Sequence, residues 1–482
     1  MSAGPPIFRL LLISALAASD ALSGEINAPP AVSQQVREQV RKIVHGGVGG
    51  AYPAVRKLDK SPAVRTYAVN VFVEATNHEN VEIRRTAAFS LGHLGDPRGA
   101  AALGVLARND PDWYVRRLAV NALVRVGEAG APALAYVIAE AELGTKQHAL
   151  RAMKRIEIMD PGPMIELLTG TSPKVKNAAL RILAFSPGPE VLDAARSALH
   201  DEAAMVRGAA VRVLRKQGLE GIKALCRRIP QENEFGVWSE AAEALAESGS
   251  PQAVQVLGAV LRGHANPGWR RYAARYLGET GRSEAIDSLS DAIADDPEAT
   301  VRGAAAEALG DIPDPGTIRP LVQALSSPDT NLRQAAAYAC RKLGQHLPDQ
   351  LAQRAPREAL LSLIQGEPTE ENLMTWQHAV RALGYTRHPE TVEPMVRVLK
   401  LCDRSRLDTR HLYLATLESL GTLRHEAAVP ALVDQIGSDG EADHKIPGRR
   451  VRQTPSTAAA AQERGEHEGG RGATHEREKS MT

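Results

Sequence analysis

Basic, small and glycine positions recur along this chain in one pattern that repeats at a nearly constant interval. Each copy places a basic residue after a turn, continues through small residues and closes on Ala-Leu-Gly or a near relative, as in residues 83–92 and 301–310. The anchoring positions lie 30 to 32 residues apart, at residues 84, 116, 146, 176, 207, 238, 270, 302 and 333. This period predicts a solenoid, in which each unit buries its apolar face only against its neighbours.

Turn residues divide each unit into two helices. The segment 109–112 (Asn-Asp-Pro-Asp) combines an N-cap acceptor with a proline near the first helical position, which predicts the start of a second helix. The glycine of each Leu-Gly, such as Gly92 or Gly310, is expected to end that helix, because glycine takes the left-handed C-cap conformation at low cost. An Asp-Pro or Ser-Pro connector then opens the next first helix, whose apolar residues have helical spacing. The earliest pair is expected at about residues 62–75 and 81–94.

The whole unit resembles the short HEAT-type repeat found in many bacterial proteins. The resemblance covers residues 62–436 and implies an all-α fold, a right-handed solenoid of about eleven HEAT-type helix pairs. Two units depart from the pattern. The one near Lys146 lacks the Val-Arg, and the one near Trp238 carries Glu240 where a base is expected.

The N-terminal segment differs in composition from the repeats. Arg9 precedes the apolar run 10–18, and small residues follow, which is typical of a secretory signal peptide. The run is too short to span a bilayer, so no transmembrane anchor is expected after its removal. A helix is expected over residues 32–44, and the glycines of residues 46–50 are expected to stop it. These glycines lack the flanking residues of a phosphate-binding loop.

Two further segments interrupt or end the repeats. Prolines at 348, 356 and 368 fall where the interval stretches, which indicates an insertion or an irregular helix pair. The last segment has almost no large apolar residue and is expected to be disordered. The expected divisions are a signal peptide at 1–23, a linker and capping helix at 24–61, regular repeats at 62–344, an irregular insertion at 345–370, C-terminal repeats at 371–436 and a disordered tail at 437–482.

Composition and charge exclude some classes of function. The 58 basic and 57 acidic residues give a net charge of +1, so the chain as a whole lacks the basic footprint of a nucleic-acid-binding protein. The cysteines, Cys226, Cys340 and Cys402, have neither metal-pair nor disulfide-framework spacing.

The recurrent arginine has a structural role implied by the HEAT resemblance, in which it bonds an acid of a neighbouring turn. A planar guanidinium can satisfy turn carbonyls and a carboxylate at once. The pairs that fit are Asp110 or Asp112 with Arg116, Asp295 or Asp296 with Arg302, and Asp329 with Arg333.

Motifs for catalysis and cofactor binding are missing. One HEAT-repeat hydroxylase family binds iron through His-Glu dyads at the start of second helices, but residues 85–86, 117–118 and 208–209 contain none here. The remaining His-Glu pairs, at 78, 425, 467 and 475, share no helical face. There is no Gly-x-Ser-x-Gly, no P-loop and no cysteine beside a predicted base. We therefore expect no enzyme activity, no metal and no cofactor.

Basic residues concentrate on the second helices of residues 112–216. Second helices usually line the concave face of HEAT-type solenoids, so this stripe could meet an acidic protein, a nucleic acid or an anionic polymer. The alternative is that these bases point into solvent or belong to the recurrent arginines. The candidate partner-binding bases are Arg117, Arg151, Arg155, Arg181, Arg212 and Arg215.

Four tryptophans fall at the start of second helices in a chain with only 4% aromatic residues. Exposed, they would anchor an interface; buried, they would fill gaps between helix pairs. The four are Trp113, Trp238, Trp269 and Trp376.

We interpret the chain as a non-enzymatic scaffold that binds an unidentified, acidic protein on an extended concave surface. The leader predicts a periplasmic or secreted protein; without it, the chain would be cytoplasmic. A nucleic-acid-binding solenoid is the alternative, because one HEAT-like family of DNA glycosylases uses a basic concave face. Short HEAT repeats also occur in phycobilin lyases, but no residue here argues for that chemistry.

Overall fold

The computed structural model describes residues 32–58, 61–402 and 407–434. The expected signal peptide and the expected disordered tail both lie outside these residues. The chain divides into two compact units, residues 1–423 and 424–482. In the second unit, the structure describes a short 3-10 helix, η8 (Glu426–Ala428), and the helical residues after it. Every regular element of the described residues is a helix, which confirms the all-α prediction.

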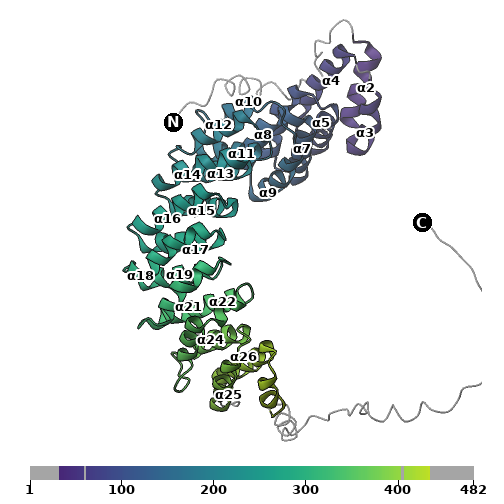
Figure 1. Cartoon of the computed structure of the whole chain (residues 1–482). Coiled ribbons are helices and arrows are strands. Elements are labelled where there is room, and N and C mark those ends of the chain that lie inside the picture. Colours follow the sequence, from purple (N-terminus) through teal and green to yellow (C-terminus); the bar gives the residue numbers. More distant parts are fainter. Residues whose placement is uncertain (1–31, 59–60, 403–406, 435–482) are drawn as a thin grey trace, which may run out of the picture. The chain divides into compact units, whose positions relative to one another are not determined.

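The first unit is a stack of helix pairs, as Figure 1 shows. The first helices are α4 (Pro62–Ala75), α6 (Ala100–Asn109), α8 (Ala131–Glu140), α10 (Gly162–Glu166), α12 (Pro189–Ala198), α14 (Gly218–Arg228), α16 (Pro251–Gly263), α18 (Ile286–Asp295), α20 (Ile318–Leu325), α23 (Arg354–Leu363) and α25 (Val392–Leu401). The second helices are α5 (Val81–Leu94), α7 (Trp113–Val126), α9 (Leu143–Ala152), α11 (Pro173–Leu183), α13 (Ala204–Lys216), α15 (Phe235–Ser248), α17 (Pro267–Glu279), α19 (Ala299–Leu309), α21 (Thr330–Leu343), α24 (Leu373–Tyr385) and α26 (Leu407–Leu423). The eleven pairs found in the described residues match the number expected from the period.

The Leu-Gly glycines have a role different from the one expected. Gly92 lies inside α5, and Gly310 has an ordinary helical φ of −66°, so neither is a left-handed cap. A Cβ at Gly92 would lie 2.7 Å from Cβ of Ala122, and one at Gly278 would lie 2.8 Å from Cα of Ala308. These glycines therefore let neighbouring second helices approach closely, and the left-handed cap of α5 is Gly95 (φ 60°).

The N-terminal segment before the repeats contains a helix that the sequence did not indicate. α2 (Gln34–His45) ends at Gly46, as expected, but α3 (Gly47–Lys57) begins at once and includes the remaining glycines of the cluster. α3 packs against α2 and α5, and Ala51 and Val55 are buried. Burial of these apolar residues overrides the low helix propensity of glycine.

The irregular segment between the two sets of repeats also contains helices. α22 (Pro348–Ala352) precedes α23, and α23 packs against α24 in the place of a first helix. Among the described residues, one helical stretch, Trp113–Glu140, is long and apolar enough to cross a membrane. It consists of α7, η2 (Gly127–Gly130) and α8, and 61% of its most apolar window is buried inside the solenoid.

Candidate functional site

The recurrent arginines join each repeat to the next. Arg270 donates from Nε and Nη2 to the two carboxylate oxygens of Asp296, at 2.7 and 2.9 Å. It also donates from Nη1 to the carbonyls of His264 and Ala265, in the turn of its own repeat. Arg207 makes the same arrangement with Glu232. These side chains are almost completely buried in repeat interfaces, so they are unavailable to a partner.

The expected pairing of arginines and acids is wrong by one repeat. The carboxylate of Asp110 accepts hydrogen bonds from Arg84, in the preceding second helix. Arg116 donates to the backbone carbonyl of Asp110 and not to its carboxylate. In the same way, Asp329 accepts from Arg302 and not from Arg333. Arg84 and Arg302 thus reach the carbonyls of their own turn and the carboxylate of the following turn, whereas Arg333 bonds, among the described residues, only groups of its own turn. A sequence in which acids flank every arginine does not show which of the two turns supplies the carboxylate.

The C-terminal part of the basic stripe is neutralised. Arg212 donates to both carboxylate oxygens of Glu240, at 2.8 and 2.9 Å, and Arg215 pairs with Glu243 and Glu247. All three acids lie on α15, the next second helix. Glu240, which stands where the repeat pattern has a base, therefore forms an ion pair with Arg212. Because Arg212 and Arg215 are both already paired, they are weak candidates for binding an acidic partner.

The N-terminal part of the stripe keeps its positive charge. Arg117 on α7, Arg151 on α9 and Arg155 in the 3-10 helix η3 (Met153–Arg155) are exposed. No carboxylate of the described residues lies within ion-pair distance of them. Burial is the largest cause that lowers the pKa of His148, and the charges of these three arginines add to it. The Nε2 atom of His148 lies 3.1 Å from Oδ1 of Asn121. All three arginines are therefore close enough to His148 for their charges to act on its ring. Arg117, Arg151 and Arg155 are called the basic surface below.

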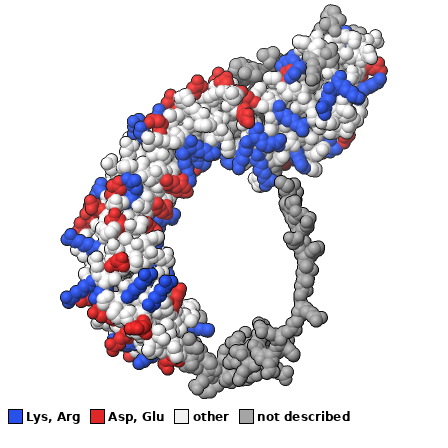
Figure 2. Space-filling view, turned by 45° about the vertical axis from the view of Figure 1, so that its right-hand side comes forward, with Lys and Arg blue, Asp and Glu red and all other residues white. Residues whose placement is uncertain are grey.

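The view in Figure 2 agrees with this distribution. Lys and Arg side chains gather on the hollowed side of the first unit, where α7 and α9 lie. Arg181 on α11 is half-buried, and burial, followed by the charge of Arg212, lowers its pKa. Arg181 therefore contributes charge nearby but is less accessible than the three arginines of the basic surface.

The tryptophans separate into one exposed residue and three buried ones. Trp113 is 60% exposed, whereas Trp238, Trp269 and Trp376 are 0%, 9% and 1% exposed. Trp238 and Trp269 lie with ring centroids 4.9 Å apart, in contact with further aromatic rings of α15 and α17. Burial assigns these three to packing. Trp113 lies four residues before Arg117, on the same face of α7, so it borders the basic surface.

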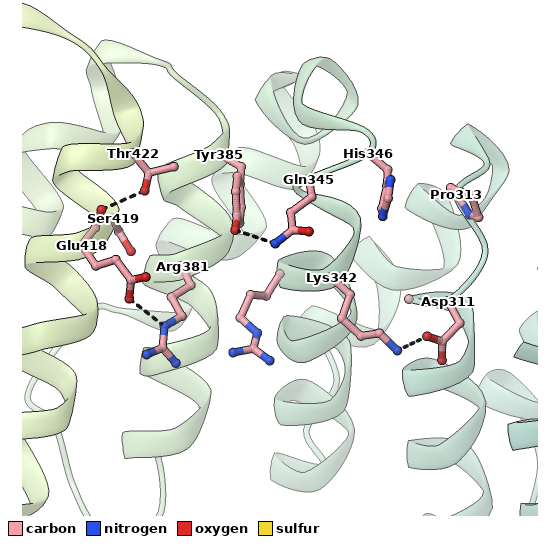
Figure 3. A pocket seen from close by; sticks show the side chains of 12 residues that line it. Asp311, Pro313, Lys342, Gln345, His346, Arg381, Tyr385, Glu418, Ser419 and Thr422 are labelled. Carbon is pink, nitrogen blue, oxygen red and sulfur yellow. Dashed lines mark hydrogen bonds and ion pairs between the residues drawn. The ribbon is translucent and has the colours of Figure 1, made fainter. Parts of the chain in front are cut away.

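A cavity of about 580 Å³ lies between the second helices of the C-terminal repeats, and no sequence motif indicated it. Figure 3 shows its wall. The charged and polar residues that line it are Asp311, Arg341, Lys342, Gln345, His346, Arg381, Tyr385, Glu418, Ser419 and Thr422. They come from α21 and the turn after it, from α24 and α26, and from the turn after α19.

Groups that could carry chemistry are few in the described part of the chain. No set of three or more His, Cys, Asp and Glu residues there is arranged to hold a metal. Cys226, Cys340 and Cys402 are buried and free. Burial raises the pKa of Cys340 to about 12 and that of Cys402 to about 11, so both are protonated thiols at neutral pH.

These features define the class of protein as an α-solenoid of stacked helix pairs. A family model described as HEAT repeats matches residues 69–154, 162–237, 222–310 and 291–355, more than half of the chain. The chain belongs to the HEAT-repeat family.

Individual relatives are more distant. A HEAT repeat-containing taxis protein of Halobacterium salinarum (strain ATCC 29341 / DSM 671 / R1) is 28% identical over 165 residues, which cover 32% of this chain and 38% of that protein. The chain therefore matches well under half of that relative's length.

Solved structures share the fold at low sequence identity. The karyopherin Kap121p, bound to the extreme C-terminus of the protein phosphatase Cdc14p, has a TM-score of 0.50 at 12% identity, covering 92% of this chain and 56% of Kap121p. Yeast importin-beta (Kap95p) has a TM-score of 0.46 at 12% identity, covering 92% of this chain and 69% of importin-beta. The similarity to Kap121p supports the solenoid fold alone.

Proposed function

We propose that this protein is a non-enzymatic scaffold whose basic surface binds an acidic segment of a partner protein. The observation that carries the proposal is the charge of Arg117, Arg151 and Arg155, which no carboxylate of the described residues neutralises. Exposed charges of one sign on a shared surface attract a partner of opposite charge and speed its association.

Trp113 gives this surface an apolar anchor. Its indole is 60% exposed, at the start of the helix that carries Arg117. Tryptophan and arginine are enriched among the residues that dominate the free energy of protein–protein binding. An exposed tryptophan beside unpaired arginines therefore favours a protein partner with an apolar side chain next to its acids.

Nucleic acid fits the same surface less well. Along the second helices the basic surface is followed by α11, which carries the half-buried Arg181, and by α13. The arginines of α13, Arg212 and Arg215, are already paired with acids of α15, namely Glu240, Glu243 and Glu247. A phosphate backbone crossing these helices would meet acids beyond the basic surface, whereas a nucleic-acid interface needs an extended basic footprint. Kap121p, whose fold is similar, is bound to a protein C-terminus, which agrees with a protein partner. That similarity is one of fold alone.

The proposed place of action is outside the cytoplasm, in the periplasm or the medium. The support is the sequence of residues 1–23, which resembles a secretory leader. An acidic partner of a mature exported protein would then be sought in the same compartment.

Cross-linking from the native compartment tests this function. A photoreactive phenylalanine derivative replaces Trp113 or, as a matched control, Leu219, which is 62% exposed on the first helix α14. Cross-links to one acidic protein from position 113 but not from 219 are the expected result. Cross-links to nucleic acid would select the alternative function, and equal labelling from both positions would contradict the proposed surface.

A further inference from the structure

The cavity in Figure 3 combines two guanidinium groups from neighbouring second helices. Arg341 lies on α21 and Arg381 on α24, and both are half-buried. His378, on the same helix as Arg381, is 8% exposed, and its ring contacts Tyr338 at a centroid distance of 5.1 Å. Burial, followed by the charges of Arg341 and Arg381, lowers the pKa of His378 to about 4. The charges of both arginines therefore act on the same buried imidazole, which is neutral at pH 7.

The charges inside the cavity do not cancel. Lys342 is paired with Asp311. Arg381 has Glu418 as its acidic neighbour, at an Nε–Oε2 distance of 3.7 Å, which is too long for a hydrogen bond. Arg341 has no ion-pair partner among the described residues, and its guanidinium stacks on Tyr338, 4.9 Å from the ring centroid. Three cations and two carboxylates leave one positive charge without a counter-charge.

A neutral donor adds to this positive charge. Gln345 donates from Nε2 to the hydroxyl oxygen of Tyr385, at 3.2 Å. Because Tyr385 accepts that bond, its hydroxyl proton remains available to a ligand in the cavity. Ser419 and Thr422 are already used, since each donates to a carbonyl of its own helix.

We propose that this cavity binds the oxyanion group of a ligand, a carboxylate or a phosphate, between Arg341 and Arg381, with the Tyr385 hydroxyl as a third donor. The guanidinium fork matches the two oxygens of such a group and forms charge-assisted hydrogen bonds with them. An oxyanion also supplies the counter-charge that Arg341 lacks.

The size of the cavity indicates that the oxyanion is part of a larger ligand. A volume of about 580 Å³ lies within the range of small-molecule sites and exceeds that of a single carboxylate. The cavity shares no residue with the basic surface, so this inference is independent of the proposed scaffold function. Failure of one leaves the other intact.

Calorimetric titration of the full chain with inorganic phosphate and with glutarate, at constant ionic strength, tests the site and distinguishes the two oxyanions. We expect one-site binding of at least one probe, with a Kd at or below ~1 mM. Binding of phosphate alone would indicate a phosphorylated ligand, and binding of glutarate alone a carboxylate ligand. Absence of saturable binding by both probes would overturn the proposal.

Variants locate the binding. Arg341→Met and Arg381→Met should each weaken binding about tenfold or more, because each removes a charge-assisted bond. Tyr385→Phe, which keeps the ring, should weaken it about fivefold through loss of one neutral hydrogen bond. The control Arg319→Met removes an exposed arginine of the first helix α20 and should leave the Kd unchanged. An equal loss in Arg319→Met, or no loss in the three cavity variants, would show that the probes bind elsewhere.

Discussion

Arg270 and Asp296 form a two-point ion pair across the boundary between two repeats, with N–O distances of 2.7 and 2.9 Å. The two side chains are only 10% and 6% exposed. Arg270 also closes the turn of its own repeat through two backbone carbonyls. One side chain therefore fixes a turn and its distance from the next turn. The same register recurs at Arg84 with Asp110 and at Arg302 with Asp329.

Loss of this guanidinium should destabilise the repeat boundary. Arg270→Met leaves a buried carboxylate and two carbonyls without their donor, and should lower the free energy of unfolding by about 3–5 kcal/mol. Hydrogen exchange should show the loss of protection in α17 and α19. The matched control Arg275→Met removes an exposed pair with Glu279 and should change stability by less than about 1 kcal/mol. Similar losses in both variants would remove the structural role given to Arg270.

Acid should weaken the same boundary. Burial raises the pKa of Asp296, but the hydrogen bonds from Arg270 and the Glu298 amide outweigh it and hold the pKa below its ordinary value. A lowered folded-state pKa gives stability that is present above the unfolded value of about 3.9 and is lost as pH falls through the folded value.

The measurement is the melting temperature at pH 7 and at pH 3. Asp296→Asn should melt lower than the wild type at pH 7, and the difference should shrink at pH 3. A constant difference between the two proteins would mean that the ionisation of Asp296 does not contribute.

The close approach of second helices gives a test of packing. Gly278→Ala places a Cβ 2.8 Å from Ala308 and should destabilise the chain by about 1–3 kcal/mol through overpacking. Gly236→Ala is the control, because Gly236 is also helical but has no atom within 4 Å of the added Cβ. The control should be neutral or stabilising by up to ~1 kcal/mol, since alanine is the better helix former. Urea unfolding of both variants measures this, and an equal response would contradict the packing role.

The amount of structure that the sequence predicts depends on how local the cause is. α4 and α5 begin and end at the predicted residues, because capping and turn residues act within a few positions. Gly92 was misassigned because its neighbour, Ala122, lies a whole repeat away. The partner of the Asp110 carboxylate could not be predicted for the same reason, because Arg84 and Arg116 both lie near it in the pattern and belong to different repeats.

The candidate sites were harder to predict for the same reason. Trp113 and Trp238 occupy similar sequence positions, and only the packing of α15 against α17 buries the second. The pairing of Arg212 with Glu240 joins residues 28 positions apart. Arg341, Arg381 and Glu418 of the cavity come from three different helices. Their arrangement depends on how these helices pack, so it corresponds to no sequence motif.

Export is tested on the protein itself. We expect a mature N-terminus near residues 19–24, because the apolar run 10–18 matches the core of a signal peptide. Mass spectrometry of the protein isolated from its natural source gives the first residue directly. An intact Met1 or Ser2 would contradict export and would move the search for the partner to the cytoplasm.

The basic surface is the central claim, and the salt dependence of partner binding tests it most directly. The cross-linked partner is titrated with the wild type, with Arg117→Gln/Arg151→Gln/Arg155→Gln, and with the control Arg212→Gln/Arg215→Gln/Arg275→Gln. The control removes three charges that carboxylates already neutralise. In low salt the basic-surface variant should bind at least about tenfold more weakly than the wild type, and the gap should narrow at high salt, where exposed charges are screened. The control should bind as the wild type does. Unchanged affinity and salt response in the basic-surface variant, or an equal loss in the control, would contradict the account.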